Sequence, residues 1–260
     1  MNTSVRSADR TMAIFEAFEK VRKPMQLREI AEHCDLPAST CHALVQTLIK
    51  RGYLYTMGRR KELYPSVRLL TMAQTIAETD PFIARMTEDL ERLSIECGET
   101  ITVGKQQGDA VLYLYALEGP RAIRYGAKAG QYRAMHSTAL GKALLSQLDP
   151  AALRAWVEAR DFERITRKTI TSRSRLLQEI EEGRERGYFT ATEEQAEDLS
   201  AIAVPLDHPA ETLALSLTGP TQRMLPMAEK FSRMLLRIKQ EFEGRGVRPK
   251  PLARRASNTT

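Results

Sequence analysis

Residues 36–54, LPASTCHALVQTLIKRGYL, decide the fold of the N-terminal part of this chain. Pro37 suits the first turn of a helix, and Gly52 suits the position just beyond its end. Between them, apolar residues recur at the spacing of one helix face: Cys41, Leu44, Val45 and Leu48. The segment therefore predicts an amphipathic helix that runs to Arg51 and packs its apolar face on neighbouring elements.

The residues around this segment predict two more helices and a β-hairpin. Apolar spacing indicates a helix over 7–20, with Ser7 as its N-cap, and a short helix over 27–33. After the 36–54 segment, residues 53–56 and 61–64 have the composition of two short strands around a turn. Three helices followed by a hairpin form a winged helix-turn-helix.

The polar face of the third helix carries residue types that read DNA. Hydroxyl, imidazole and amide groups hydrogen-bond base edges in a major groove, while lysine and arginine contact phosphates. The candidate DNA-binding residues are Ser39, Thr40, His42, Ala43, Gln46 and Lys50 on the helix, with Arg59, Arg60 and Lys61 at the wing tip. A plain amphipathic helix with a solvated polar face is the alternative.

The charge distribution agrees with a polyanionic partner for the N-terminal part. The chain has 260 residues and a formal net charge of +6. Residues 1–70 carry +5, residues 71–244 carry −4, and residues 245–260 carry +5. A basic N-terminal part on a mildly acidic body suggests a polyanionic partner, although many solvated protein faces are also basic.

The rest of the chain predicts an α+β domain, because helices and strands alternate irregularly from about residue 80. Helices are expected at 66–79, 83–97, 139–148, 150–159, 173–186 and 224–243, and strands at 100–103, 111–117, 123–125, 188–192, 201–205 and 212–217. The expected organisation is a DNA-binding domain over 1–65, a linker helix over 66–79, a second domain over 80–245 and a disordered basic tail over 246–260.

Several classes of protein are disfavoured by what the sequence lacks. No run of about 18 apolar residues could span a membrane, and the N-terminus has no signal-peptide core, so a cytoplasmic protein is expected. Cys34, Cys41 and Cys97 form no paired framework and suggest reduced thiols. With His33 and His42 they match no zinc spacing, so neither metal nor cofactor is expected. No P-loop, G-x-S-x-G or H-E-x-x-H motif indicates an enzyme.

Three segments, in order, resemble signatures of the IclR family of transcriptional regulators. They are LPASTCHAL with GYL in residues 36–54, MHSTALGKALL in residues 135–145, and RGY, EE, IAVP and LSLTGP between residues 186 and 220. The resemblance implies a GAF-like effector-binding domain over 80–245, a dimer built through the DNA-binding heads, and often a tetramer formed as a dimer of dimers. It also implies control of a catabolic operon by a metabolite.

Four positions depart from the family pattern. Ala43 stands where many members have arginine, which removes one expected DNA contact. Ala191 and Thr192 stand where members commonly have aspartate, and Ala201 stands where some have cysteine. Operator preference therefore cannot be carried over from other members, and the effector can differ as well.

The 135–145 segment also has a physical reason to bind an anion. Ser137 or Thr138 can cap a helix that starts near Ala139, whose first N–H groups lack internal partners. By resemblance, the candidate effector-binding residues are Arg124, Tyr125, Arg133, Met135, Ser137, Ala139, Leu140, Ala201, Ser216 and Thr218. Two arginines without the aspartates favour a carboxylate, although both could be surface residues. A mostly apolar lining favours an aromatic or short aliphatic monoacid.

The sequence thus predicts a sequence-specific regulator of transcription, with no catalytic residues. Its expected partners are double-stranded operator DNA, a small organic acid, and further copies of itself as a homodimer or tetramer. Two alternatives remain at this point: a ligand-independent, nucleoid-type DNA binder or repressor, and a small-molecule enzyme.

Overall fold

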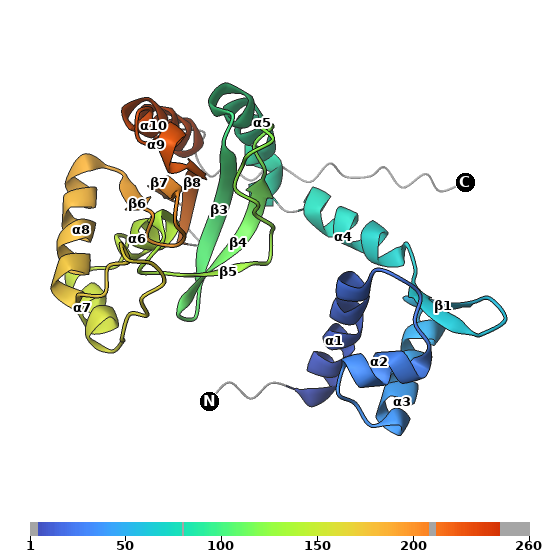
Figure 1. Cartoon of the computed structure of the whole chain (residues 1–260). Helices are drawn as coiled ribbons and strands as arrows, with labels where there is room; N and C mark the ends of the chain where they lie inside the picture. Colours follow the sequence, from blue (N-terminus) through green and yellow to red (C-terminus); the bar gives the residue numbers. More distant parts are fainter. Residues whose placement is uncertain (1–4, 80, 208–211, 245–260) are drawn as a thin grey trace, which may run out of the picture. The chain divides into compact units, whose positions relative to one another are not determined.

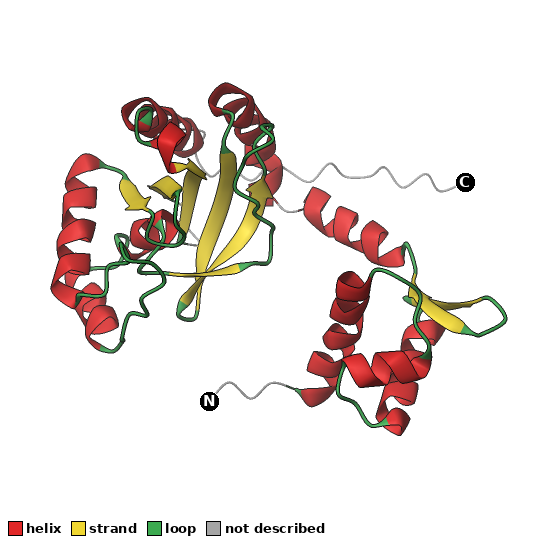
Figure 2. Ribbon diagram, in the orientation of Figure 1, coloured by secondary structure: helices red, strands yellow, loops and turns green. Residues whose placement is uncertain are grey.

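The computed structural model describes residues 5–79, 81–207 and 212–244, so the tail expected over 246–260 lies outside the described residues. Contacts divide the chain into two compact units, Met1–Ala84 and Arg85–Thr260. The first unit combines helices with a two-stranded hairpin, and the second builds helices around a six-stranded sheet (Figures 1 and 2).

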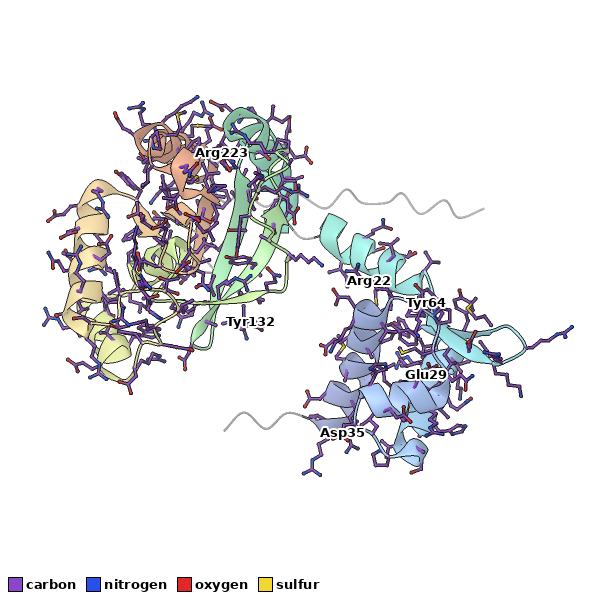
Figure 3. All side chains as sticks on the ribbon, in the orientation of Figure 1. Arg22, Glu29, Asp35, Tyr64, Tyr132 and Arg223 are labelled. Carbon is purple, nitrogen blue, oxygen red and sulfur yellow. The ribbon has the colours of Figure 1, made fainter. Side chains whose placement is uncertain are left out.

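The elements of the first unit follow the expected order: α1 (Arg6–Val21), α2 (Leu27–His33), α3 (Ala38–Lys50), β1 (Leu54–Met57), β2 (Glu62–Pro65) and α4 (Arg68–Thr79). The expected N-cap at Ser7 is wrong, because α1 begins one residue earlier and the carbonyl of Ser7 accepts the Thr11 hydroxyl at 2.8 Å. Arg22 ends α1 in a left-handed conformation, with its N–H donating to Phe18 O (Figure 3).

One apolar cluster holds the three helices and the hairpin of this unit together. Ile14, Ile30 and Cys41 contribute fully buried side chains from α1, α2 and α3. Met25, between α1 and α2, exchanges two backbone hydrogen bonds with Leu63 of β2. These bonds fix the hairpin against the helices, so the turn between β1 and β2 projects as a wing.

The elements of the second unit are α5 (Pro81–Cys97), β3 (Thr100–Gln107), β4 (Ala110–Leu117), β5 (Tyr132–Ala134), α6 (Ala139–Leu145), α7 (Pro150–Glu158), α8 (Arg173–Arg186), β6 (Phe189–Thr192), β7 (Leu199–Leu206), β8 (Leu213–Pro220), α9 (Thr221–Met224) and α10 (Ala228–Gly244). The sheet has the order β5-β4-β3-β8-β7-β6, and every neighbouring pair is antiparallel. Its two central strands, β3 and β8, are far apart in the sequence. The sheet therefore forms only when the two ends of this unit come together.

Helices cover both faces of this sheet. Alternate residues of a strand point to opposite faces. On β7, Ala201 and Ala203 join the apolar cluster that contains α6. Ile202 and Val204 are also buried but lie outside that cluster, and α10 packs against the same strand. The sheet is therefore a middle layer between helices.

The expected strand over 123–125 is wrong, because these residues lie in the loop that precedes β5. The carbonyl of Tyr125 accepts the Thr100 hydroxyl at 2.6 Å, and the carbonyl of Ile123 accepts the Arg223 guanidinium at 2.8 Å. Side chains thus take the acceptors that a neighbouring strand would need. The edge strand is β5 instead, and its Tyr132 is 54% exposed (Figure 3).

The expected start of the last helix, at residue 224, is wrong, because residues 225–227 form a turn. A short helix, α9, follows β8 directly, and α10 begins only at Ala228. Arg223 in α9 forms a fork with buried Glu99, from Nε to Oε1 at 2.6 Å and from Nη2 to Oε2 at 2.9 Å. This charge-assisted pair anchors α9 to the start of β3.

Candidate functional sites: an exposed helix face and a buried cavity

The third helix turns the expected reading face outward. Its apolar residues Cys41, Val45 and Leu48 are buried against the rest of the first unit. On the opposite side, the side chains of five of the candidate residues are exposed: Ser39, His42, Ala43, Gln46 and Lys50. Thr40 is half-buried at the edge of that face. The helix period alone separates these two sets, so the expected face exists as a continuous surface.

Thr47 also lies on this exposed face but is not among the candidate residues. Its hydroxyl donates to the carbonyl of Ala43 at 2.9 Å, one turn earlier. Because residues four apart are neighbours on a helix, the spacing from Ala43 is the signal that could have identified it. The helix has no charged residue before Lys50.

The wing places its three cations in solvent. Arg59, Arg60 and Lys61 lie in the turn between β1 and β2, and all three are exposed. The turn is tight because Gly58 and Lys61 both adopt positive φ angles, of 67° and 53°, and the Lys61 N–H donates to Gly58 O. The wing tip therefore presents positive charge in a defined conformation.

A pocket lies in the second unit, and about 350 Å³ of non-atom space, part of it open solvent, falls within it. It is lined by Tyr113, Tyr125, Ser137, Thr138, Ala139, Leu140, Ala191, Gln195, Leu199, Ser200, Ala201, Ser216 and Thr218. Seven of the ten candidate effector residues are among them; the exceptions are Arg124, Arg133 and Met135. Ala191, singled out by its departure from the family pattern, also lines the wall.

The lining is neutral. Alanines, leucines and tyrosine rings form apolar walls, while hydroxyl groups and one amide supply the polar contacts. Several hydroxyls are already engaged: Ser137 donates to Gln195 Oε1 at 2.8 Å, and Ser216 shares a hydrogen with Thr102 at 2.7 Å. The Thr218 hydroxyl has no side-chain hydrogen bond within the described part of the chain. A ligand here meets donors and acceptors but no formal charge.

The two arginines take different roles from the expected one. Arg124 pairs with Glu118 at 2.7 Å on the surface and does not line the cavity. Arg133 stands behind the wall, where its Nε donates to the Tyr125 hydroxyl at 3.1 Å and its guanidinium lies 5.7 Å from the centre of the Tyr113 ring. Both tyrosines line the cavity, whereas Arg133 itself does not. Met135 is fully buried in the apolar cluster.

Helix α6, which carries the G-K pair of the 135–145 segment, is buried at all seven residues. Thr138 caps it, with its hydroxyl accepting the Gly141 N–H at 3.1 Å. A side chain at Gly141 would place its Cβ 2.0 Å from the carbonyl oxygen of Met135. The glycine of this motif is therefore required by close packing.

Lys142 of the same helix forms a buried ion pair with Glu194. Its ammonium donates to Glu194 Oε1 at 2.6 Å and to Thr190 O at 2.9 Å, and both side chains are less than a tenth exposed. Burial raises the pKa of the Glu194 carboxyl above its usual range. Oxygen Oε2 of Glu194 has no hydrogen-bond partner within the described residues.

The ion pair supports the segment that walls one side of the cavity. Glu193 and Asp198, at the ends of the turn between β6 and β7, both have positive φ angles. Gln195 lies within that turn, and its Oε1 accepts a hydrogen bond from Ser137, which also lines the cavity. Lys142 thus ties α6 to the residue next to Gln195, and the motif helix and the turn close the cavity together.

His136 precedes the cavity-lining Ser137 and belongs to an aromatic stack. Its ring lies 5.0 Å from that of Phe162, and Phe162 lies 6.1 Å from Trp156. A ring nitrogen, Nε2, is 3.0 Å from the carbonyl oxygen of Glu163. Burial lowers the pKa of His136, and the nearby charge of Lys142 acts in the same direction.

Four lining residues have no signal in the sequence: Tyr113, Gln195, Leu199 and Ser200. They come from two strands and a turn, and meet only because β4, β7 and α6 are brought together by the sheet. Cys41 and His42 of α3 lie on opposite faces of that helix. Cys41 is buried, with its thiol 3.8 Å from Leu27 O, while its neighbour His42 points outward. No described helix is long and apolar enough to cross a membrane.

Comparison with known proteins gives matches across both units. Residues 7–57 match the model of the IclR helix-turn-helix domain, and residues 74–241 match that of the bacterial transcriptional regulator IclR C-terminal domain. The HTH-type transcriptional regulator BhcR of Paracoccus denitrificans is 31% identical over 222 residues, which cover 85% of this chain and 79% of that protein. KdgR of Escherichia coli, also an HTH-type transcriptional regulator, is 28% identical over 85% of this chain and 84% of that protein.

A solved structure shares the fold over almost the whole chain. It is an IclR homolog from Microbacterium hydrocarbonoxydans complexed with 4-hydroxybenzoate, with a TM-score of 0.74 at 22% identity, covering 92% of this chain and 99% of that one. The expected α+β fold with an N-terminal helix-turn-helix is confirmed. Because the C-terminal model alone matches more than half of the residues, this chain belongs to the IclR family of bacterial transcriptional regulators.

Proposed function

We propose that this regulator binds the operator of a catabolic operon through α3 and the wing, and that a small organic acid in the cavity controls this binding. The observation that carries the proposal is the pairing of two surfaces in one chain. One is an exposed helix face with polar side chains, and the other is a neutral pocket, partly open to solvent, in a separate compact unit. Residues 1–65 would read DNA, 66–79 would link, and 80–245 would sense.

The DNA partner is a double-stranded, roughly palindromic site. Ser39, His42 and Gln46 would face base edges from the first half of α3, and the wing cations would contact phosphates. Members of this family are regulators and not enzymes, and a bacterial chromosome lies in the cytoplasm, so we assign the protein to that compartment. A homodimer, or a dimer of dimers, would place two recognition helices about 10 bp apart, or a multiple of that distance.

The effector would be held by neutral donors. Arg133 donates its Nε–H to the Tyr125 oxygen, so the phenolic hydrogen of Tyr125 is left to point elsewhere. An acid oxygen in the cavity is the acceptor that suits this phenol and the unengaged Thr218 hydroxyl. Apolar walls at Leu140 and Ala201 suit the carbon part of a small acid. The structural neighbour with 4-hydroxybenzoate bound supports an acid of this size.

The test uses the full chain and DNA from the region that flanks its own gene. Footprinting locates the protected sequence, and fluorescence anisotropy then measures affinity with and without added acids. The first acid is 4-hydroxybenzoate, with 4-hydroxybenzamide as its neutral counterpart, followed by short aliphatic acids. A ligand that prefers one state of the protein changes DNA affinity by about 5- to 150-fold.

A cavity-filling variant separates the two halves of the proposal. Ala201→Phe adds a ring to the cavity wall and should abolish the response to acids while DNA binding persists. Leu225→Phe, at a residue 53% exposed, is the matched control and should keep the response. If the protein protects a specific DNA sequence but no acid alters its affinity or thermal stability, the chain is a ligand-independent DNA binder.

A further inference from the structure

The reading face of α3, defined here as Ser39, His42, Ala43, Gln46 and Thr47, is unusual in its charge. All five residues are exposed, and none is an arginine, lysine, aspartate or glutamate. The first cation on the helix is Lys50, in the last turn, whereas the N-terminal half enters the groove. The fork that arginine or lysine offers to guanine is therefore absent from this face, as is a carboxylate acceptor for cytosine.

Gln46 is the residue on this face that can make a two-point contact. Its side chain is exposed and makes no hydrogen bond within the described part of the chain. A free amide pairs with adenine through N6 and N7, with one acceptor and one donor. His42, one turn earlier on the helix, offers single contacts instead of a fork.

Next to Gln46 runs a short apolar strip. The methyl group of Ala43 is exposed, and Thr47 lies one turn further along. Because the Thr47 hydroxyl donates its hydrogen to the carbonyl of Ala43, Thr47 has no donor left for a base, and the methyl group of this exposed residue remains for apolar contact. Methyl groups contact the C5-methyl of thymine in the major groove.

The amide and the methyl strip suit the same base pair. An A·T pair displays the N6 and N7 of adenine beside the methyl of thymine in the major groove, and a G·C pair displays neither pattern. We propose that the base pair read by Gln46 in each half-site is A·T, with thymine methyls at that pair or its neighbour contacting Ala43 and Thr47. The inference rests on the proposed function, in which α3 is the reading helix.

The test is selection of binding sites from a random double-stranded DNA library by the full chain, followed by sequencing. Parallel selections use Gln46→Ala, which should relax the preference for adenine at one position of each half-site by about 5- to 150-fold and leave other positions unchanged. If Gln46→Ala relaxes a G·C position, or relaxes none, the inference is overturned while specific binding stands. If the parent enriches no sequence at all, the proposed function itself fails.

A second pair of variants tests the methyl strip. Ala43→Arg supplies the missing fork and should add a preference for guanine at a position adjacent to the Gln46-dependent one. Ala43→Leu has comparable bulk without a guanidinium and should add none. Circular dichroism confirms that each variant folds, which is expected because residue 43 is exposed. An unchanged selected sequence for Ala43→Arg would show that this side of α3 does not face the bases, and would overturn the inference.

Discussion

Two helices, α3 and α6, carry the strongest motifs of the sequence, and they use them in opposite ways. On α3 the polar residues Ser39, His42 and Gln46 are exposed on one face, while Cys41 of the same motif is buried on the other. On α6 every residue is buried, including Lys142, which has no exposed surface. Only Ala139 and Leu140 of α6 line the cavity. A motif in a regulator can therefore encode a contact surface in one unit and a packing solution in another.

Lys142 is the residue at which a single change should have the largest effect on stability. Lys142→Met leaves the Glu194 carboxylate buried without its partner, which costs about 3–5 kcal/mol in the free energy of unfolding. Urea unfolding of the second unit measures this loss. Lys50→Met on α3 is the matched control and should leave stability unchanged, because Lys50 is exposed. Equal effects of the two changes would remove the distinction between the helices.

Replacing both charged residues of this ion pair tests whether the charges themselves are needed for stability. A Lys142→Met, Glu194→Leu double variant removes both charges and should recover much of the lost stability, because an apolar pair of similar volume avoids the cost of desolvation. If the double variant is as unstable as Lys142→Met, the pair serves packing that methionine and leucine cannot reproduce.

A smaller loss is expected from a single methyl group on α6. Gly141→Ala brings a Cβ into the Met135 carbonyl, which the chain can relieve only by moving backbone, at a cost of about 1–3 kcal/mol or more. Ser39→Ala on the exposed face of α3 should change stability by no more than about 0.5 kcal/mol. Thermal unfolding of both variants checks the difference, and a stable Gly141→Ala would mean that α6 is not tightly seated.

The wing should show the reverse behaviour, with an effect on DNA and none on folding. Replacing Arg59 and Arg60 by alanine should weaken specific and non-specific complexes alike, and lower the slope of log K against log salt by about 0.9 per lost phosphate contact. The thermal midpoint should stay that of the parent, since both side chains are exposed. An unchanged salt slope would show that the wing tip points away from DNA.

The smallest expected effect is a dependence of stability on pH. Because burial lowers the pKa of His136 in the folded protein, the folded state disfavours its charged form. The resulting stability is present above the ordinary pKa of about 6.5 and is lost as the pH falls through the lowered value. His136→Phe keeps a ring against Phe162 but cannot titrate, so its loss of stability between pH 7.5 and pH 5 should be smaller than that of the parent.

The two helices also explain which parts of the molecule the sequence could predict. The α3 face and the wing are local, and a helix period or a hairpin turn is enough to place Gln46 or Arg59. The cavity is assembled from distant strands, so nothing near Tyr113 or Ser200 marks them as neighbours. The direction of a long side chain is equally hidden. Arg124 turns to Glu118, and no local pattern indicates this.

The position of the edge strand could not be predicted from the sequence for a related reason. The residues 123–125 have the composition of a strand, but Thr100 and Arg223, on other elements, take their carbonyl oxygens as acceptors. Propensity describes what a segment can do alone, whereas this loop is fixed by tertiary hydrogen bonds. The strand at Tyr132–Ala134 forms instead, by pairing with Ala110–Leu112 on the edge of β4.

The stack of His136, Phe162 and Trp156 has a practical consequence, because Trp156 is the sole tryptophan of the chain. Light at the long-wavelength edge of protein absorption excites this indole alone. The emission therefore reports on the surroundings of Trp156. The stack ends beside Ser137 on the cavity wall. Shifts in the colour and intensity of that emission should therefore follow occupation of the cavity in the unlabelled protein, while the DNA-binding unit contributes no background.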